Sequence, residues 1–433
     1  MINHYPKGAL DKQALQPPFA VLASDINRYV LDNGLVVLTK EVYPSNVVFL
    51  SLWVKVGSTD ETDEKAGLSH FVEHMLFKNT KKRNVGQVAQ EIHSLGGYLN
   101  GFTSFDCTSY WIVLPGKHFH KALEIQFDAA FNPQFDQKEV DKERKVILEE
   151  IKMYRDRPAD YLGDKLMSHA FTKHRYGRPI IGYKEVVEET TTEDLKQYYH
   201  SFYKPNNCFI LAVGNIETMD MIRRAERTYR KLKEGAITRN SSPKEPPQKT
   251  MERFEMEGDI FTGHMQFAIH IPSIFSKEIY ACDILASILG QGKSSRLYRE
   301  LREERKLVNS ISANTYIQKD PGILFVDAEL SPENIEDAEK AIIEVVTKLA
   351  DEGFTEEEFI RAKSLNESSY IYGQETVEGQ GRKIGSAEAM GDYMLAQKFI
   401  PRLMMTDAND TLKVARKYLK TDNMTIGIYK PKK

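Results

Sequence analysis

The sequence predicts an α+β protein made of two homologous halves, each a mainly antiparallel sheet covered by helices. Strand-like apolar segments alternate with helical ones, and the strand-like segments occur in hairpin-like pairs. Residues 231–250 are rich in Ser, Pro, Lys and Asn and have no apolar periodicity, which is typical of a linker. The order of elements before this stretch recurs after it, and that recurrence predicts the duplication.

The first half begins with an apolar strand and ends with a long charged helix. Between them the pattern predicts one helix, a strand pair and a second helix. These expected elements are the strand 47–56, the helix 67–77, the strand pair 98–114 and the helices 122–130 and 137–155.

The second half repeats this order. The expected elements are the strand 264–271, the helix 278–289, the strands 308–316 and 323–330, the helix 335–350 and a charged helix from Thr355. FDQKEVDKERKVILEE (135–150) aligns without a gap with FTEEEFIRAKSLNESS (354–369). We therefore expect a first half at 22–232, a linker at 233–250 and a second half at 251–433.

Composition excludes several classes of protein. The 433 residues contain 59 Lys and Arg against 62 Asp and Glu, a net charge of −3, so neither nucleic acid nor a polybasic membrane patch is expected as a partner. No apolar run reaches the roughly 18 residues of a membrane span, and Asp11, Pro17 and Pro18 interrupt any signal-peptide core. Three widely spaced cysteines favour a reducing compartment. We expect a cytoplasmic protein, or a periplasmic one if an export signal has been removed.

The segment AGLSHFVEHMLFKNT carries the clearest chemical motif. His70, Glu73 and His74 stand at positions i, i+3 and i+4, which share one face of a helix. Two imidazoles one turn apart can bind one zinc ion, and the carboxylate between them is placed to take a proton from the attacking water. The alternative, two histidines that merely pack or face water, is disfavoured by the complete H-x-x-E-H order.

A hydrolytic zinc site needs a third protein ligand, and the helix after Phe135 offers one. At 100° per residue, Glu143 and Glu150 fall on the apolar stripe of that helix, whereas Glu149 faces the Lys-rich side. Burying a carboxylate without a partner costs several kcal/mol, and a zinc ion would offset that cost. We expect Glu150 to be the ligand and Glu143 to support the site. An amphipathic helix with a wide polar face is the alternative.

These residues give the chain a strong resemblance to the pitrilysin family of zinc metallopeptidases. His70-x-x-Glu73-His74, followed by Glu143 and Glu150, is similar to the family's signature, and the likeness extends from about Tyr29 to Tyr429, closest to the bacterial processing-peptidase-like branch. The resemblance implies that His70, His74 and Glu150 hold Zn²⁺, that Glu73 is the general base, and that Glu143 supports the ligands. It also implies two similar halves enclosing a chamber.

The segment SLGGYLNGFTSFDCTSYWIVLP resembles the family's substrate-side strand. Asn100 and Gly101 match the positions that hold an extended substrate backbone as an added strand. Gly96, Gly97 and Asn100 are equally typical of a plain hairpin, so both interpretations stay open.

The second half lacks the metal chemistry, because Ala362 and Ser369 replace Glu143 and Glu150. The segment SSRLYRELREERKLVNS resembles a family feature in which an Arg and a Tyr, seven residues apart, bind substrate. Arg302 fits the Arg position, but Asn309 stands where Tyr is expected. This departure implies a homodimer or a heterodimer in which a homologous subunit supplies the Arg/Tyr pair. A solvated helix arginine is the alternative for Arg302.

LGQGKSS (289–295) resembles a phosphate-binding loop only superficially. The first glycine of that motif would be Ser287, and a helical segment rather than a strand precedes it. A helix-ending glycine turn is the better interpretation. The sequence therefore predicts a zinc endopeptidase acting on peptides or unstructured segments, with a weakly active, partner-dependent processing-peptidase subunit as the alternative.

Overall fold

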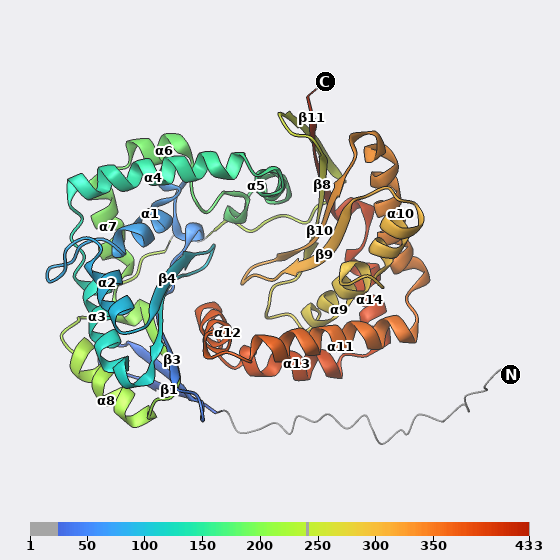
Figure 1. Cartoon of the computed structure of the whole chain (residues 1–433). Helices are drawn as coiled ribbons and strands as arrows, with labels where there is room; N and C mark the ends of the chain where they lie inside the picture. The colour runs from blue at the N-terminus through green and yellow to red at the C-terminus, as the bar shows by residue number, and fades with distance from the viewer. Residues whose placement is uncertain (1–24, 240–241, 433) are drawn as a thin grey trace, which may run out of the picture.

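Each half of the chain is built around one β-sheet, as the sequence predicts (Figure 1). The computed structural model describes residues 25–239 and 242–432. The first sheet has the strand order β1-β2-β6-β3-β5-β4 and the second β7-β11-β8-β10-β9. The strands of the first sheet are β1 (Ile26–Val30), β2 (Val36–Glu41), β3 (Val47–Val54), β4 (Tyr98–Thr103), β5 (Thr108–Pro115) and β6 (Cys208–Gly214). Those of the second are β7 (Glu252–Gly258), β8 (Gly263–Ile271), β9 (Ser310–Tyr316), β10 (Gly322–Leu330) and β11 (Met424–Pro431).

The two sheets share one topology. Neighbouring strands are antiparallel except for one parallel pair in each sheet, β2 with β6 and β7 with β11. These pairs occupy the same place in both orders, and β4 and β9 are the matching edge strands. The predicted α+β duplication is confirmed.

Helices flank both sheets, and all the helices expected from the sequence are present. The helices of the first half are α1 (Leu68–Leu76), α2 (Gln87–Ser94), α3 (Phe119–Phe131), α4 (Gln137–Arg155), α5 (Pro158–Ala170), α6 (Lys184–Glu189), α7 (Thr192–Phe202) and α8 (Thr218–Tyr229). Those of the second are α9 (Ile279–Gly290), α10 (Ile335–Glu352), α11 (Glu356–Gly373), α12 (Val377–Met390), α13 (Leu395–Met405) and α14 (Ala408–Tyr418). Among the described residues no helix is long and apolar enough to cross a membrane.

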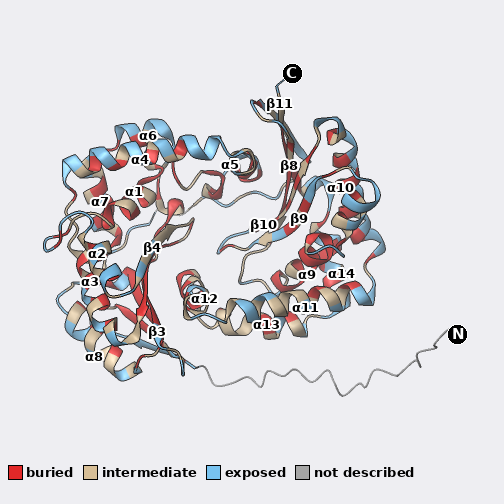
Figure 2. Cartoon of the chain, in the orientation of Figure 1, coloured by how far each residue is buried: buried red, intermediate tan, exposed pale blue. Residues whose placement is uncertain are grey.

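The halves exchange one helix with each other. Helix α5 packs on β8 and β11 of the second sheet, while α12 packs on β3 and β6 of the first. The two helices begin 219 residues apart, at Pro158 and Val377, the same interval that separates α4 from α11. They are therefore equivalent elements of the duplication. Because each half covers a sheet face of the other, buried side chains lie on both faces of the sheets. β3 and β8 are accordingly buried along most of their length (Figure 2).

The linker carries no helix or strand in its described residues but is tied down at two points. Arg239 binds the Asp60 carboxylate and the Asn207 side chain. The Glu245 carboxylate accepts hydrogen bonds from the backbone N–H groups of Lys173 and His174. The predicted domain boundaries at residues 22 and 433 lie outside the described residues. So does the N-terminal segment 1–24, for which the sequence predicts no signal peptide.

The helix-ending turn predicted at 289–295 is present. Helix α9 ends at Gly290, and Gly292 adopts a left-handed backbone conformation with φ 80°. Glycine takes this conformation without a steric penalty. The segment is a helix stop, not a phosphate-binding loop.

Candidate metal centre and cleft

Helix α1 places the motif residues at the floor of a cleft. Its start is fixed by Glu61, whose carboxylate accepts hydrogen bonds from the backbone N–H groups of Gly67 and Ser69 at 2.8 and 2.6 Å. These two N–H groups belong to the first turn, where no partner exists within the helix. Phe71 and Met75 are buried on the opposite side of the helix. The cap and the apolar face together fix the direction in which His70, Glu73 and His74 point.

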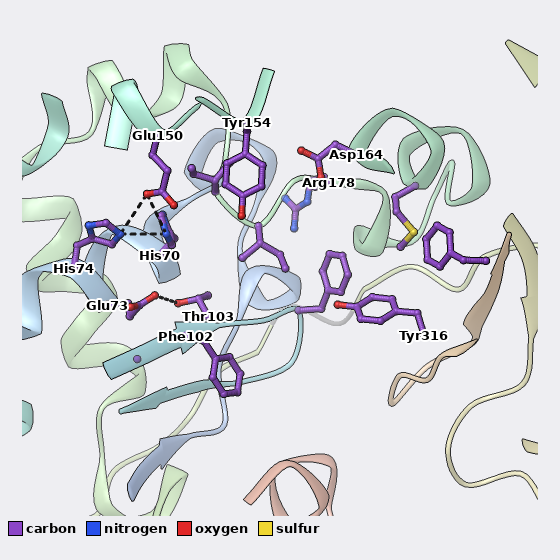
Figure 3. A pocket seen from close by; sticks show the side chains of 16 residues that line it. His70, Glu73, His74, Phe102, Thr103, Glu150, Tyr154, Asp164, Arg178 and Tyr316 are labelled. Atoms are coloured by element: carbon purple, nitrogen blue, oxygen red, sulfur yellow. Dashed lines mark hydrogen bonds and ion pairs between the residues drawn. The ribbon is translucent and has the colours of Figure 1, made fainter. Parts of the chain in front are cut away.

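Three possible ligand atoms converge at the motif (Figure 3). His70 Nε2 and His74 Nε2 lie 3.2 Å apart, and Glu150 Oε2 on α4 lies 3.8 and 3.6 Å from them. Within the described residues, His70, His74 and Glu150 form the group of side chains suited to holding a metal ion. Helices α1 and α4 thus bring together residues that are about 80 positions apart in the sequence.

The donor set fits zinc. Burial and the neighbouring His74 lower the pKa of His70 to about 3, so its ring is neutral and can act as a ligand at neutral pH. Two ring nitrogens and one carboxylate oxygen are the three-ligand set of many hydrolytic zinc sites, which keep the fourth position open. The Nδ1 atom of His70 is buried and has no hydrogen-bond partner in the part of the chain that the structure describes, so this ring is held mainly by packing.

Glu143 orients the second histidine. Its Oε1 lies 2.8 Å from His74 Nδ1, and its Oε2 accepts from Lys78 Nζ at 2.6 Å. Burial alone would raise the pKa of Glu143, but the hydrogen bonds from His74 and Lys78 outweigh it and lower the pKa. An ionised Glu143 holds the proton on His74 Nδ1 and leaves Nε2 free for a metal. Glu149 is exposed and pairs with Lys152, as expected.

Glu73 lies beside the three donor atoms, between α1 and the edge strand β4. Its Oε2 accepts a hydrogen bond from the Thr103 hydroxyl at 3.1 Å. Burial raises the pKa of Glu73, an effect that the charge of His74 and the Thr103 bond only partly oppose. A Cβ atom at Gly101 would lie 3.0 Å from Glu73 Oε1, so glycine at this position keeps space open next to the carboxylate.

The metal centre opens into a cleft of about 580 Å³ that both halves line. Tyr154 and Asp164 come from the first half, and Tyr316 reaches it from the second (Figure 3). Phe325 of the second half also lines it. Burial, together with the nearby Asp160, raises the pKa of Asp164 to about 6. β4 is an edge strand with Gly101 facing this cleft. Asn100 is exposed, and its side-chain oxygen accepts a hydrogen bond from the backbone N–H of Gly101.

Two family models match the chain in succession. Residues 36–184 match the model described as Insulinase (Peptidase family M16), and residues 189–366 match the Peptidase M16 inactive domain. A Rickettsia felis protein described as an uncharacterized zinc protease is 30% identical over 92% of this chain and 95% of its own length. The chain belongs to peptidase family M16. The resemblance seen in the sequence is thereby confirmed, and relatives named zinc proteases imply zinc as the metal.

Further M16 relatives span the same length. The Bacillus subtilis protein named uncharacterized zinc protease YmxG is 28% identical over 94% of this chain and 98% of its own. The crystal structure of a protease from Helicobacter pylori superposes with a TM-score of 0.89 at 25% identity, covering 94% of this chain and 99% of that one. A Pseudomonas fluorescens structure described as a peptidase M16 inactive domain shares the fold, with a TM-score of 0.86 at 18% identity over 95% and 98% of the two chains.

The M16 inactive-domain model begins inside the first structural half. Residues 189–232 contain α7, β6 and α8, and β6 lies within the first sheet between β2 and β3. The second half itself carries Ala362 and Ser369 where the first has Glu143 and Glu150, in keeping with the description as inactive.

Several residues that line the M16 cleft were not predicted from the sequence. Thr103 lies in the predicted substrate-side strand, two residues after Gly101 and therefore on the same face. This spacing could have predicted that Thr103 lines the cleft. Tyr154 follows Glu150 by one helical turn and was equally accessible to this reasoning. Tyr316 and Phe325 reach the cleft only because the halves face each other, and no local pattern marks them.

Arg302 and Asn309 do not join this cleft. Both are exposed, and neither lines it. The Arg302 guanidinium lies 5.1 Å from the centre of the Tyr298 ring. The expectation that Arg302 binds substrate is therefore not met at the metal centre of its own chain.

Proposed function

We propose that this protein is a zinc-dependent endopeptidase that cleaves extended peptides or unstructured protein segments. His70, His74 and Glu150 would hold the metal. The observation that carries the proposal is the convergence of these three donor groups beside the buried carboxylate of Glu73, next to the free edge of β4. When bound, zinc would polarise the scissile carbonyl and acidify the attacking water.

Glu73 is the proposed general base and acid. Its Oε2 is held by Thr103, while its Oε1 faces the space beside Gly101. The raised pKa brings the carboxyl nearer to neutral pH, where a group can both accept a proton from water and return it to the leaving amine. Glu143 keeps the His74 ring in position throughout.

The substrate backbone is proposed to bind along the free edge of β4. An extended peptide can add to an open sheet edge through main-chain hydrogen bonds. At this edge Asn100 already accepts from the N–H of Gly101, so an incoming carbonyl would exchange with the Asn100 side chain. Gly101 of this edge faces a cleft of about 580 Å³, which is too small to admit a folded domain, and this favours unstructured substrates.

Replacing Glu73 by Gln separates binding from chemistry. The amide cannot accept a proton, so we expect turnover of an internally quenched peptide to fall by about two to four orders of magnitude, with zinc content unchanged. Glu149→Gln, on the exposed side of α4, is the matched control and keeps wild-type turnover. Near-wild-type cleavage by the Glu73→Gln protein would place the general base elsewhere.

A second candidate, a subunit that needs a partner, is favoured by Asn309 and by the exposed position of Arg302. A missing donor near the scissile carbonyl typically costs about two to three orders of magnitude in rate. We propose that a homologous subunit, in a homodimer or a heterodimer, adds an Arg and a Tyr to this site. Cleavage by the lone chain is then weak and rises on mixing with such a homologue.

The concentration dependence of cleavage distinguishes the two arrangements. Full activity that does not change with protein concentration excludes a partner. In a homodimer, Arg302→Ala lowers activity without changing zinc content. Lys413→Met, an exposed change on α14, serves as the control.

A further inference from the structure

A second cavity, of about 430 Å³, lies in the second half between α9, α11, α12 and α13. It is the counterpart of the zinc cleft in the duplication. Glu150, Asp164 and Met167 line the zinc cleft, and the residues 219 positions later, Ser369, Lys383 and Ser386, line the second cavity. Both halves thus keep a cavity at this place. In the second half the hydroxyl of Ser369 replaces the metal ligand Glu150, and the ammonium group of Lys383 replaces the carboxyl of Asp164.

Lys383 is a half-buried cation without an anion. Its Nζ lies 3.8 Å from the centre of the Tyr370 ring and 3.4 Å from the Tyr370 carbonyl oxygen. Among the described residues no carboxylate lies within 4.0 Å of it, whereas its neighbour Arg382 pairs with Glu378. Burial lowers the pKa of Lys383, as expected for an ammonium group whose lost hydration has not been replaced.

Asp283 brings the opposite charge from another wall of the cavity. Its carboxylate accepts a hydrogen bond from the Thr315 hydroxyl, and no described cation pairs with it. Burial raises the pKa of Asp283 to about 6. A partly buried charge normally has a partner of opposite charge. Lys383 and Asp283 therefore leave the cavity with one uncompensated group of each sign.

Helix α13 gives the cavity an apolar wall. Leu395, Phe399 and Ile400 line it on this side, together with Ile274 from the loop after β8. An apolar lining with a few polar groups fixed in place is the usual composition of a small-molecule site.

We propose that this cavity binds the free terminal groups of an apolar amino acid or of a very short peptide. The α-carboxylate pairs with Lys383, the α-ammonium group pairs with Asp283, and the apolar side chain packs on α13. Each ligand charge thus meets a protein group that has no oppositely charged neighbour among the described residues. The inference rests on the second cavity alone and does not depend on the proposed peptidase activity.

Calorimetric titration of the zinc-loaded full chain tests the inference. L-leucine and Leu-Leu are the probes, and we expect saturable binding by at least one of them below about 10 mM. Leucinamide lacks the carboxylate and N-acetylleucine lacks the ammonium group, and each weakens binding by about tenfold or more, which corresponds to ~1.4 kcal/mol. Absence of saturable binding by both L-leucine and Leu-Leu would overturn the proposal, as would equal binding of the blocked compounds.

Two variants locate the bound probe. Lys383→Met and Asp283→Asn each weaken binding by about tenfold or more, while Lys413→Met, on the exposed face of α14, has no effect. Leucinamide and N-acetylleucine are measured on the unmodified protein, so the proposal can be tested even if a variant does not fold. Binding that disappears when zinc is removed but is unchanged by Lys383→Met would place the probe in the zinc cleft. That result refutes the assignment.

The same titration identifies the source of the ligand. Tighter binding of L-leucine than of Leu-Leu supports a free amino acid, and the reverse order supports the ends of a short peptide. In both cases the binding is retained after zinc is removed with a chelator, because Ser369 stands where the zinc cleft has Glu150.

Discussion

Helices α4 and α11 are equivalent elements of the duplication, yet one serves the site and the other serves the fold. α4 turns Glu143 and Glu150 toward α1, where two histidines face them. At the same positions α11 has the buried Ala362 and the exposed Ser369. α11 instead begins with a capping box between Thr355 and Glu358, whose carboxylate also binds Arg296. The comparison shows that one scaffold supports either function, and that a few side chains decide which.

The largest expected effect comes from making α4 resemble α11 at the metal centre. Glu150→Ser removes the third ligand and leaves two histidines, so we expect the purified protein to lose nearly all its zinc and its peptide cleavage. Metal content by mass spectrometry and peptide turnover check this. Ser369→Glu, the reverse change, should add no second zinc to the one held by the first half, because no His-x-x-Glu-His segment faces it in α9. Zinc retained by Glu150→Ser would mean that the ligand set is wrong.

The exchanged helices α5 and α12 give the next effect, on stability. Leu166 in α5 is fully buried against the second sheet, and the equivalent residue in α12 is Gly385. A Cβ atom at Gly385 would lie 2.2 Å from the Trp53 ring, so this contact has no room for a side chain. Leu166→Ala opens a cavity and should lower the free energy of unfolding by about 2–5 kcal/mol.

Gly385→Ala tests the same contact from the other side. We expect a loss of about 1–3 kcal/mol from overpacking, although alanine normally favours a helix. Urea unfolding measures both variants. Gly163→Ala in α5 is the matched control, because a Cβ atom there would meet its nearest neighbour at 3.5 Å, an ordinary contact. Stabilisation by Gly385→Ala would show that α12 does not lie tightly on the first sheet.

The sequence predicted those parts of the molecule that depend on local periodicity. The helix Gln137–Arg155 and the inward direction of Glu143 and Glu150 followed from the 100° rotation per residue, and the aligned charged helices revealed the duplication. The exchange of α5 and α12 did not follow, because local pattern shows that a helix has an apolar face but not which sheet covers it. Tyr316 and Phe325 were missed for the same reason, since their role depends on how the halves face each other.

The smallest effect concerns the capping box of α11 and its dependence on pH. Burial alone would raise the pKa of Glu358, but the hydrogen bonds from Arg296, at 2.7 and 2.8 Å, and from Thr355 outweigh it and lower the pKa to about 2. A carboxyl with a depressed pKa in the folded state stabilises the protein above its ordinary pKa, and this contribution disappears as the pH falls toward the folded value. Allowing for solvent screening, we expect about 2 kcal/mol.

Glu358→Gln should therefore lower the free energy of unfolding by about 2 kcal/mol at pH 7 and by almost nothing near pH 2. Urea unfolding of zinc-free protein across this range isolates the effect, because protonation of the histidines is common to both proteins and cancels. Glu139→Gln is the matched control at the equivalent position of α4. Among the residues that the structure describes, Glu139 pairs only with the exposed Lys142 one turn later, an interaction worth less than about 0.5 kcal/mol. A difference between wild type and Glu358→Gln that does not change with pH would show that the Arg296 pair stabilises α11 by packing and not by charge.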